Sequence, residues 1–246
     1  MIMKNLFLLL FLLIASFGVQ AQKKLLTINP ASLHSPDLSD STHAGFDRRD
    51  HLESIPRDEM SSSEIEELDS LYKKYGEVYG SAWDIIGGGC SWYCGGGNDS
   101  VYTSSSLDST NDIGYNALMA NDFSYKTAWV EGVDGSGIGE YIAYTFENHS
   151  PRVTEIIISN GYMKSDSSWS QNNRVKQLKL FVNGRPYALL NLHDSRTDQS
   201  FPIGILGRNT DGSKLVLKFE IMKVYRGTKY DDTAITEIYF DGIDVH

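Results

Sequence analysis

The chain has 246 residues, with 22 Lys and Arg against 32 Asp and Glu, which gives a formal net charge of −10. This acidity excludes a nucleic-acid-binding protein of the usual kind, because contacts with phosphate groups need a basic surface. The 41% of hydrophobic residues are enough to build a core, whereas two Cys cannot form a disulfide scaffold. The 22 Gly and 14 Tyr favour an all-β architecture with tight turns.

The first residues have the composition of a secretory signal peptide. Lys4 precedes an apolar run over residues 6–14, and Val19 and Ala21 supply the small-residue pattern of a signal-peptidase site. The run is shorter than the roughly 20 residues that a membrane span needs, and no Cys follows it to carry a lipid. The sequence therefore predicts that residues 1–21 are removed, that no transmembrane segment remains, and that the protein is secreted, periplasmic or at the cell surface.

Residues 22–85 form a polar segment that is expected to act as a tether. Residues 29–57 contain three Pro and scattered Ser and Asp with little apolar periodicity, which predicts a loop-like stretch. One short helix is expected near residues 61–79. Its apolar side chains recur at helical spacing, and three Ser precede Glu64 at its start, as capping residues do.

From about residue 98 the pattern changes to short strand-like runs separated by turn residues. Leu178 and Leu180 alternate with polar neighbours, which is the period of a strand with one buried face. Asn183 and Gly184 join two runs and predict a two-residue hairpin. The runs are rich in Val, Ile, Tyr and Phe and cover residues 139–146, 153–159, 175–182, 187–192, 214–221 and 234–240. The sequence therefore predicts a jelly-roll β-sandwich over residues 86–246.

Several ordered motifs resemble those of discoidin domains. Residues 116–129 resemble the A-x-D-(G)-(D)-x-x-T-x-W segment of discoidin, or F5/8 type C, domains of the galactose-binding-like group, and residues 235–242 resemble their last strand. Five further motifs are similar to the glycan-binding or translocation domain that accompanies bacterial NAD glycohydrolases, at residues 129–132, 137–141, 160–162, 173–176 and 230–233. The resemblance implies a discoidin-like β-sandwich that binds glycans. Residues 22–97 leave no room for a separate NAD-cleaving domain, so it implies the binding module alone.

The resemblance also implies a loop that holds a structural cation. Asp122, Ser124, Thr127 and Glu237 occupy the matching positions, and oxygen ligands of this kind suit Ca²⁺. The alternative is that Asp122 and Thr127 close turns through their own hydrogen bonds while Glu237 lies at the surface. Phe123 stands where Gly is common in the family, so the loop departs from the pattern at this position.

The loop at residues 160–175 is the first choice for a glycan-binding site. A sugar site on such a sandwich combines an aromatic platform with planar hydrogen-bonding side chains in the end loops. Ordinary loop packing of Trp169 and an ion pair of Arg174 at the end of a strand are the alternatives. The candidate contacts, from this loop and a neighbouring one, are Tyr162, Trp169, Asn172, Asn173, Arg174, Asp194 and Arg196. Trp129 occupies a core position of the family and is expected to be structural.

Cys90 and Cys94, with three Gly on each side, form an unusual motif at residues 87–97. Three residues lie between the cysteines, and an exported protein meets oxidising conditions, so the motif predicts a small local disulfide. A redox C-x-x-C pair has a different spacing, and no His has a recognised spacing that would complete a zinc site. The loop is also a candidate contact surface that presents Trp92 and Tyr93.

The sequence favours a protein that is not an enzyme. Ser136 lacks the G-x-S-x-G frame of a serine hydrolase, and the adjacent Asp231 and Asp232 are expected to point apart. The leading hypothesis is an exported carbohydrate-binding module whose partner is a glycan or glycoconjugate. The alternative is a module that docks a co-secreted or surface protein through the same loops without binding sugar.

Overall fold

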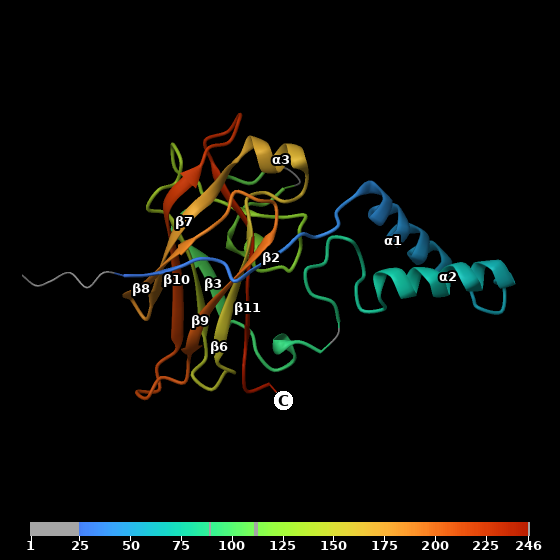
Figure 1. Cartoon of the computed structure of the whole chain (residues 1–246), viewed down its shortest axis with the longest axis horizontal. Helices are drawn as coiled ribbons and strands as arrows, with labels where there is room; N and C mark the ends of the chain where they lie inside the picture. Colours follow the sequence, from blue (N-terminus) through green and yellow to red (C-terminus); the bar gives the residue numbers. More distant parts are fainter. Residues whose placement is uncertain (1–24, 89, 111–112, 246) are drawn as a thin grey trace, which may run out of the picture.

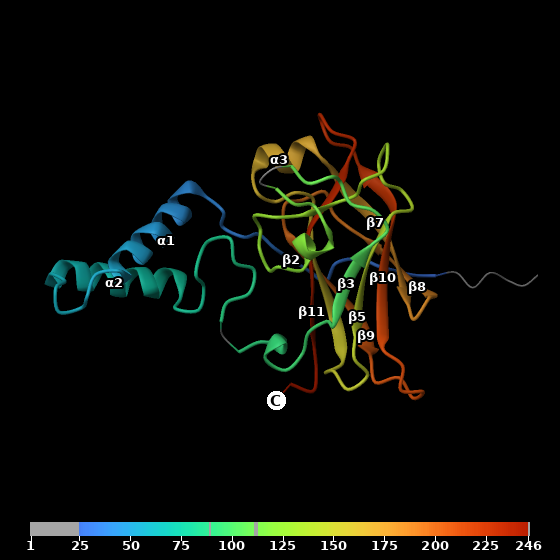
Figure 2. The same cartoon turned by 180° about the vertical axis from the view of Figure 1, so that it is seen from behind.

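The protein consists of a β-sandwich with a pair of helices on one side (Figures 1 and 2). The structure, a computed structural model, describes residues 25–88, 90–110 and 113–245. The predicted signal peptide at residues 1–21 lies outside the described residues. Within the described part of the chain, no helix has the length and apolar composition needed to cross a membrane.

Strands form the greater part of the molecule. They are β1 (Leu26–Ile28), β2 (Ser32–His34), β3 (Ser100–Thr103), β4 (Trp129–Val130), β5 (Tyr141–Phe146), β6 (Val153–Asn160), β7 (Asn173–Val182), β8 (Arg185–Asn191), β9 (Asp198–Leu206), β10 (Leu215–Tyr225) and β11 (Thr233–Gly242). One layer has the order β3-β5-β10-β7-β8-β1, and the other has the order β2-β9-β6-β11-β4. A two-residue parallel pairing of β11 with β7 joins the layers. This arrangement confirms the predicted all-β sandwich.

The core lies between the two layers. The alternating side chains of β10 that face it, from Leu215 to Ile221, are buried, and Phe201 and Phe240 from the other layer are buried with them. Trp129 is fully buried and its indole nitrogen donates to the carbonyl oxygen of Ser105 at 2.9 Å, which is the structural position expected for it. Buried side chains fill the space between the layers, so a ligand can reach only residues outside this core.

The predicted hairpin turn is present between β7 and β8. Asn183 and Gly184 have φ of 49° and 75°, so both central residues are left-handed, as a type I′ turn requires. All six predicted strand runs correspond to strands of the structure. Strand β9 was not predicted, because Pro202 and Gly204 interrupt its apolar pattern and its first residues are polar.

The prediction of a loop over residues 29–57 was wrong in its second half, where α1 (Asp40–Glu53) forms. Ser39 caps this helix by accepting a hydrogen bond from the backbone nitrogen of Thr42. The buried face of α1 combines Phe46 and Leu52 with the polar Thr42 and Arg49, so the face has no apolar periodicity that a sequence pattern could reveal. The predicted helix is α2 (Ser62–Tyr75), and its first turn contains the expected capping box of Ser61 and Glu64.

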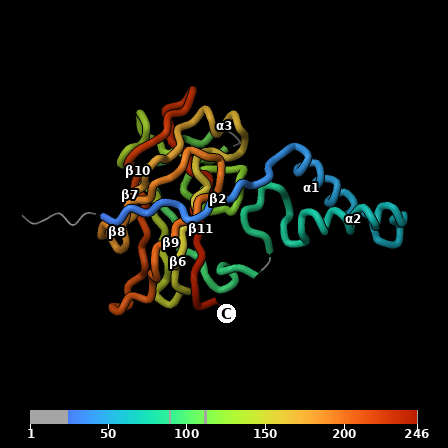
Figure 3. The backbone as a smooth tube through the Cα atoms, in the orientation of Figure 1, coloured from blue at the N-terminus to red at the C-terminus, as the bar shows by residue number. Residues whose placement is uncertain are grey.

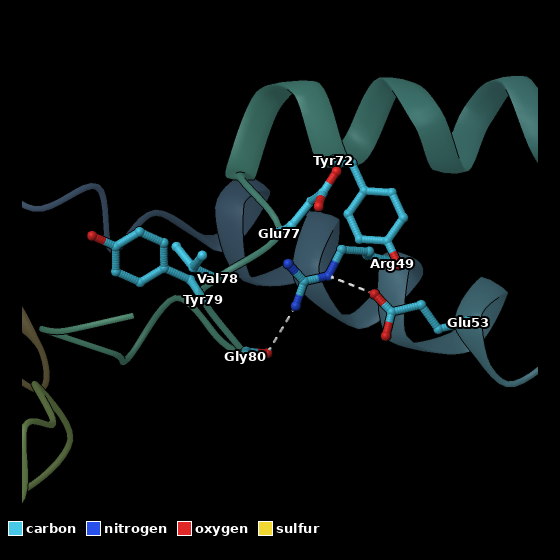
Figure 4. A pocket seen from close by; sticks show the side chains of 7 residues that line it. All are labelled: Arg49, Glu53, Tyr72, Glu77, Val78, Tyr79 and Gly80. Atoms are coloured by element: carbon cyan, nitrogen blue, oxygen red, sulfur yellow. Dashed lines mark hydrogen bonds and ion pairs between the residues drawn. The ribbon is translucent and has the colours of Figure 1, made fainter. Parts of the chain in front are cut away.

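Arg49 connects α1 to the end of α2 and to the segment after it, and Figure 4 shows its contacts with Gly80 and Glu53. Its guanidinium group donates to the carbonyl oxygens of Gly76 at 3.1 Å and Gly80 at 3.2 Å, and it forms an ion pair with Glu53 at 3.2 Å. The same group lies 4.7 Å from the centre of the Phe46 ring. Because Arg49 is 3% exposed, these contacts replace nearly all of its hydration. The buried cation is therefore one of the contacts that hold the two helices together as a hairpin.

The segment before the hairpin is part of the sandwich, which corrects the prediction of a separate tether. β1 pairs with β8 in parallel, and β2 pairs with β9 in antiparallel orientation, as the chain crosses the sandwich (Figure 3). After the hairpin, the backbone nitrogen of Ile85 donates to the carbonyl oxygen of Phe123 at 2.9 Å. The described part of this segment, residues 25–85, is thus attached to the sandwich on both sides of the helices.

The Cys-containing loop packs against the sandwich instead of presenting its aromatic side chains to solvent. Trp92 is 4% exposed and belongs to the core, and Tyr93 accepts a hydrogen bond from the backbone nitrogen of Phe240 at 2.8 Å. Both lie in the 3₁₀ turn η1 (Trp92–Cys94). The expectation of a contact surface made by these two rings was therefore wrong. The side chains of Cys90 and Cys94 are exposed and hydrogen-bonded to each other.

Candidate functional site

The loops between the strands gather at the end of the sandwich where β7 begins. The loop predicted at residues 160–175 contains the short helix α3 (Asp166–Gln171), which Ser165 caps through the backbone nitrogen of Ser168. The loop between β10 and β11 and the loop after β3 meet it at this end. Three chain segments that are far apart in the sequence therefore surround one hollow.

This hollow, called the α3 hollow below, has a volume of ≈470 Å³. Its aromatic lining consists of Tyr115, Tyr162 and Tyr230, and its main polar side chains are Lys164, Gln171, Asn172 and Asp232. Tyr230 is 42% exposed, whereas Tyr162 is 8% exposed and rests on the small apolar cluster below the hollow. The structure thus places two of the predicted contacts, Tyr162 and Asn172, at the hollow.

Trp169 and Arg174 belong to a separate structural cluster behind the hollow. The indole nitrogen of Trp169 donates to the carbonyl oxygen of Asn160 at 3.0 Å, and the Arg174 guanidinium lies 4.6 Å from the centre of the Trp169 ring. Both nitrogens of the Arg174 fork donate to the Asp194 carboxylate at 3.0 Å. Gly161 packs closely against this cluster. A side chain would not fit there, because a Cβ at Gly161 would be 2.5 Å from the Arg174 side chain. The alternatives of loop packing and a strand-end ion pair therefore describe these residues.

The two other predicted contacts also support the backbone. Asn173 has no exposed surface, and its side chain donates to the carbonyl oxygen of Asp231 and accepts from the backbone nitrogen of Gly227. Arg196 donates to the carbonyl oxygen of Met163 at 3.0 Å and pairs with Asp166 at 2.6 Å. Asn173 is therefore unavailable to a ligand, and Arg196 holds the loop that leads into α3. Tyr115 was missed because no pattern in the sequence links it to this loop.

The predicted cation loop brings two carboxylates together. Asp122 accepts hydrogen bonds from the hydroxyl of Thr127, at 2.7 and 2.9 Å, and from the backbone nitrogen of Ser124. Glu237 accepts from the backbone nitrogens of Asp122 and Phe123 through Oε2. It is completely buried, so the alternative that placed it at the surface was wrong, whereas the turn-closing role that the same alternative gave to Asp122 and Thr127 is present. Phe123 has φ of 57°, a left-handed backbone conformation that Gly adopts most readily. This is the position at which the resemblance leads us to expect Gly.

The second oxygen of Glu237, Oε1, is buried and has no hydrogen-bond partner in the part of the chain that the structure describes. Burial, followed by the negative charge of Asp122, raises the pKa of Glu237 well above its ordinary range. An unpartnered carboxylate oxygen beside a second carboxylate fits a hard cation with oxygen ligands. Within the described residues, no group of three or more His, Cys, Asp and Glu gathers around a common point, so further ligands would come from hydroxyl and carbonyl oxygens.

Several solved structures are similar to the chain at low sequence identity. The CBM32-1 and CBM32-2 domains of Clostridium perfringens ZmpB, in complex with GalNAc, match with 12% identity and a TM-score of 0.43, over 59% of this chain and 33% of that one. A second C. perfringens protein, CpGH89CBM32-5 in complex with GalNAc-β-1,3-galactose, matches with 13% identity and a TM-score of 0.41, over 58% of this chain and 94% of that one. The Streptococcus pyogenes NAD⁺-glycohydrolase translocation domain matches with 22% identity and a TM-score of 0.31, over 47% and 97% of the two chains.

No curated protein sequence matches the chain significantly. At the family level, residues 92–241 match the NAD glycohydrolase translocation F5/8 type C domain family. This range begins at η1 and ends in β11, so it contains the strands of the sandwich from β3 onward and all residues of the α3 hollow. The chain therefore belongs to the NAD glycohydrolase translocation F5/8 type C domain family.

Proposed function

We propose that the protein is an exported, non-catalytic carbohydrate-binding module and that the α3 hollow holds the sugar. The observation that carries the proposal is the combination of tyrosine rings with planar polar side chains around one open hollow. A sugar ring packs its C–H face on an aromatic ring while its hydroxyls exchange hydrogen bonds with amide, carboxylate and ammonium groups. Export rests on the signal-like pattern of residues 1–21.

Tyr230 is the residue in this hollow that offers the most accessible aromatic surface. Its ring is 42% exposed, and the ammonium group of Lys229 lies 4.7 Å from its centre. Lys164 and Asn172 lie on the α3 side of the hollow, and Asp232 lies on the Tyr230 side, so donors and acceptors flank the ring. Truncation of Tyr230 removes the platform without removing a core side chain.

A glycan array probed with a tetramerised form of residues 22–246 tests the proposal. Selective binding is expected for the unchanged chain, with a loss of about fivefold or more in Tyr230→Ala, because a stacked ring contributes about 1 kcal/mol or more. Tyr102→Ala is the matched control, since Tyr102 is 44% exposed on β3 and does not line the hollow. An array without signal, or equal signal from the chain and Tyr230→Ala, contradicts the proposal.

The second candidate function is docking of a partner protein through the same end loops. The observation that favours it is the family description, which names translocation and an NAD glycohydrolase. Competition with free monosaccharide separates the two candidates. Capture of a co-secreted or surface protein that excess monosaccharide does not reduce supports docking, and capture that the sugar abolishes supports carbohydrate recognition.

We also propose that a structural Ca²⁺ binds between Asp122 and Glu237, with Ser124 and Thr127 supplying neighbouring oxygens. Ca²⁺ at about 100 times its dissociation constant would stabilise the fold by about 2.7 kcal/mol. This corresponds to a rise in Tm of roughly 5–10 °C for a protein of this size. In Glu237→Gln, calorimetry with Ca²⁺ and with chelator should give the same Tm, because the amide keeps the backbone hydrogen bonds but lacks the charge. If chelator leaves the Tm of the unchanged chain where it was, the cation is not part of the structure.

A further inference from the structure

A second polar hollow lies at the end of the sandwich opposite α3. It has a volume of ≈730 Å³ and lies between the turn that joins β7 to β8 and the loop that joins β9 to β10. Its lining includes Asn183, Arg185, Tyr187, Asn209 and Asp211, and these residues define the turn hollow. β7 begins beside α3 and ends at this turn, so the two hollows are separated by the length of one ten-residue strand, about 33 Å.

Internal hydrogen bonds fix the walls of the turn hollow. The Asn183 side chain accepts from the backbone nitrogen of Val216 at 2.8 Å, which ties the turn to β10. On the other wall, the Asn209 side chain donates to the carbonyl oxygens of Ser213 and Lys214 at 3.0 and 3.1 Å. A ligand therefore meets a preformed surface and does not have to order either loop.

The bonds that fix the walls leave both donors and acceptors for a ligand. The Asn183 side chain forms its hydrogen bond through its oxygen, and its NH₂ group has no partner among the described residues. The Asn209 side chain forms its bonds through its nitrogen, and its carbonyl oxygen has no partner among the same residues. Asp211 accepts from Ser213 through Oδ1 only, which leaves Oδ2. Sugar hydroxyls both donate and accept, so a mixed set of this kind matches them better than it matches an anion or a cation.

Arg185 differs from the other basic residues near this end. Arg152 and Arg208 pair with Asp244, and Lys214 pairs with Asp99 and Glu147. No ion pair or hydrogen bond of the Arg185 guanidinium occurs among the described residues, although it lines a hollow that also contains Asp211. Its planar fork can donate to two adjacent oxygens of one ligand. The half-buried ring of Tyr187, whose hydroxyl donates to the carbonyl oxygen of Ile203, lies in the same wall.

We propose that the turn hollow is a second saccharide-binding site, in which Arg185 donates to two neighbouring sugar oxygens and Asn183, Asn209 and Asp211 hydrogen-bond the remaining hydroxyls. The ligand class rests on the proposed function, because both sites would take residues of glycans. Two sites at opposite ends allow one molecule to bridge two glycan chains, which raises avidity without an oligomer.

A printed oligosaccharide array probed with residues 22–246 tests this site separately from the α3 hollow. Arg185→Ala is expected to lower a subset of the signals by at least about tenfold, the effect of one charge-assisted hydrogen bond, and Tyr230→Ala to lower a different subset. Arg57→Ala is the matched control, because Arg57 lies on the helical hairpin, is exposed and lines neither hollow. Arg185 is exposed, so its replacement is expected to leave the fold intact, and circular dichroism checks this.

The outcomes separate the two proposals. If Arg185→Ala gives the pattern of the unchanged chain while Tyr230→Ala loses signal, the turn hollow is not a site and the proposed function stands. If Arg185→Ala alone loses signal, the second site stands and the α3 hollow is not the sugar site. If the unchanged chain binds no oligosaccharide, or if both variants keep every signal, both proposals are overturned.

Discussion

Asp198 is a buried carboxylate whose hydrogen-bond partners among the described side chains are hydroxyl groups. Ser159 and Tyr125 donate to it at 2.5 Å each, and Tyr239 donates at 3.4 Å. His34 of β2 lies opposite Asp198 of β9 in the antiparallel pairing of these two strands. Asp198 is therefore located where the N-terminal segment joins the sandwich. Burial outweighs the hydroxyl donors and raises the pKa of Asp198 above its ordinary value.

This shift predicts a pH-dependent stability. The folded state holds the Asp198 proton more tightly than the unfolded state, so the contribution is complete below the ordinary Asp pKa of about 4 and is lost as the pH rises through the folded-state pKa. In Asp198→Asn this dependence disappears. Urea unfolding of both proteins between pH 3.5 and 7 should therefore show the unchanged chain losing free energy of unfolding relative to the variant as the pH rises. Parallel pH profiles would refute the prediction.

The helical hairpin contains one buried cation, Arg49, beside its aromatic contact of Phe46 with Tyr75. Arg49→Met removes the donors to the carbonyl oxygens of Gly76 and Gly80 and the cation that pairs with Glu53. The hairpin is expected to lose about 1–3 kcal/mol, the usual cost of leaving hydrogen-bond acceptors without their charged donor. Hydrogen exchange should then speed up in α1 and α2 but not in the sandwich.

Arg48→Met is the control for this experiment. Arg48 is the neighbouring residue and pairs with Glu67 at 2.7 Å, but both side chains are exposed, so the pair is screened by water. Its replacement is expected to leave exchange in the hairpin almost unchanged. Equal effects of the two variants would show that the charge of α1, and not the buried contacts of Arg49, holds the helices together.

The loop with Cys90 and Cys94 is an element whose state depends on oxidation. The Cys94 side chain hydrogen-bonds that of Cys90 and raises its pKa, so the two sulfur atoms are already neighbours. Oxidation is expected to form the predicted disulfide, and a reductant should then lower the Tm by roughly 4–8 °C. Alkylation followed by mass spectrometry of protein purified from an oxidising compartment provides the check. Two alkylated thiols without prior reduction would rule the disulfide out.

At the scale of the whole molecule, the N-terminal strands protect the edges of the sandwich. β1 covers β8 and β2 covers β9, so a chain that starts at residue 86 would expose both edge strands. Residues 86–246 are expected to have a lower Tm than residues 22–246 and to self-associate through these edges. Calorimetry and size-exclusion chromatography compare the two chains. A monomeric shorter chain of equal Tm would show that the segment is a tether after all.

The sequence by itself determined the β-sandwich, its hairpin turn, helix α2 and the family. These features depend on local patterns, namely the alternation of Leu178 and Leu180, the pair Asn183–Gly184 and the capping residues Ser61 and Glu64. The family assignment depends on short motifs whose residues are adjacent in the sequence. One of the loops that border the α3 hollow, at residues 160–175, could be named for the same reason, since loops at the ends of a sandwich are the part that is free to bind.

The tertiary structure alone decided which of those loop residues are available. Trp169, Asn173 and Arg174 have the same chemical character as a sugar contact, but partners from distant strands and loops, such as Asp194, Gly227 and Arg226, use their polar groups. Helix α1 and strand β9 likewise depend on contacts across the fold, since polar side chains in both are buried by hydrogen bonds to other segments. A sequence pattern records the period of burial along one segment, but it does not record the partner that makes the burial of a polar group favourable.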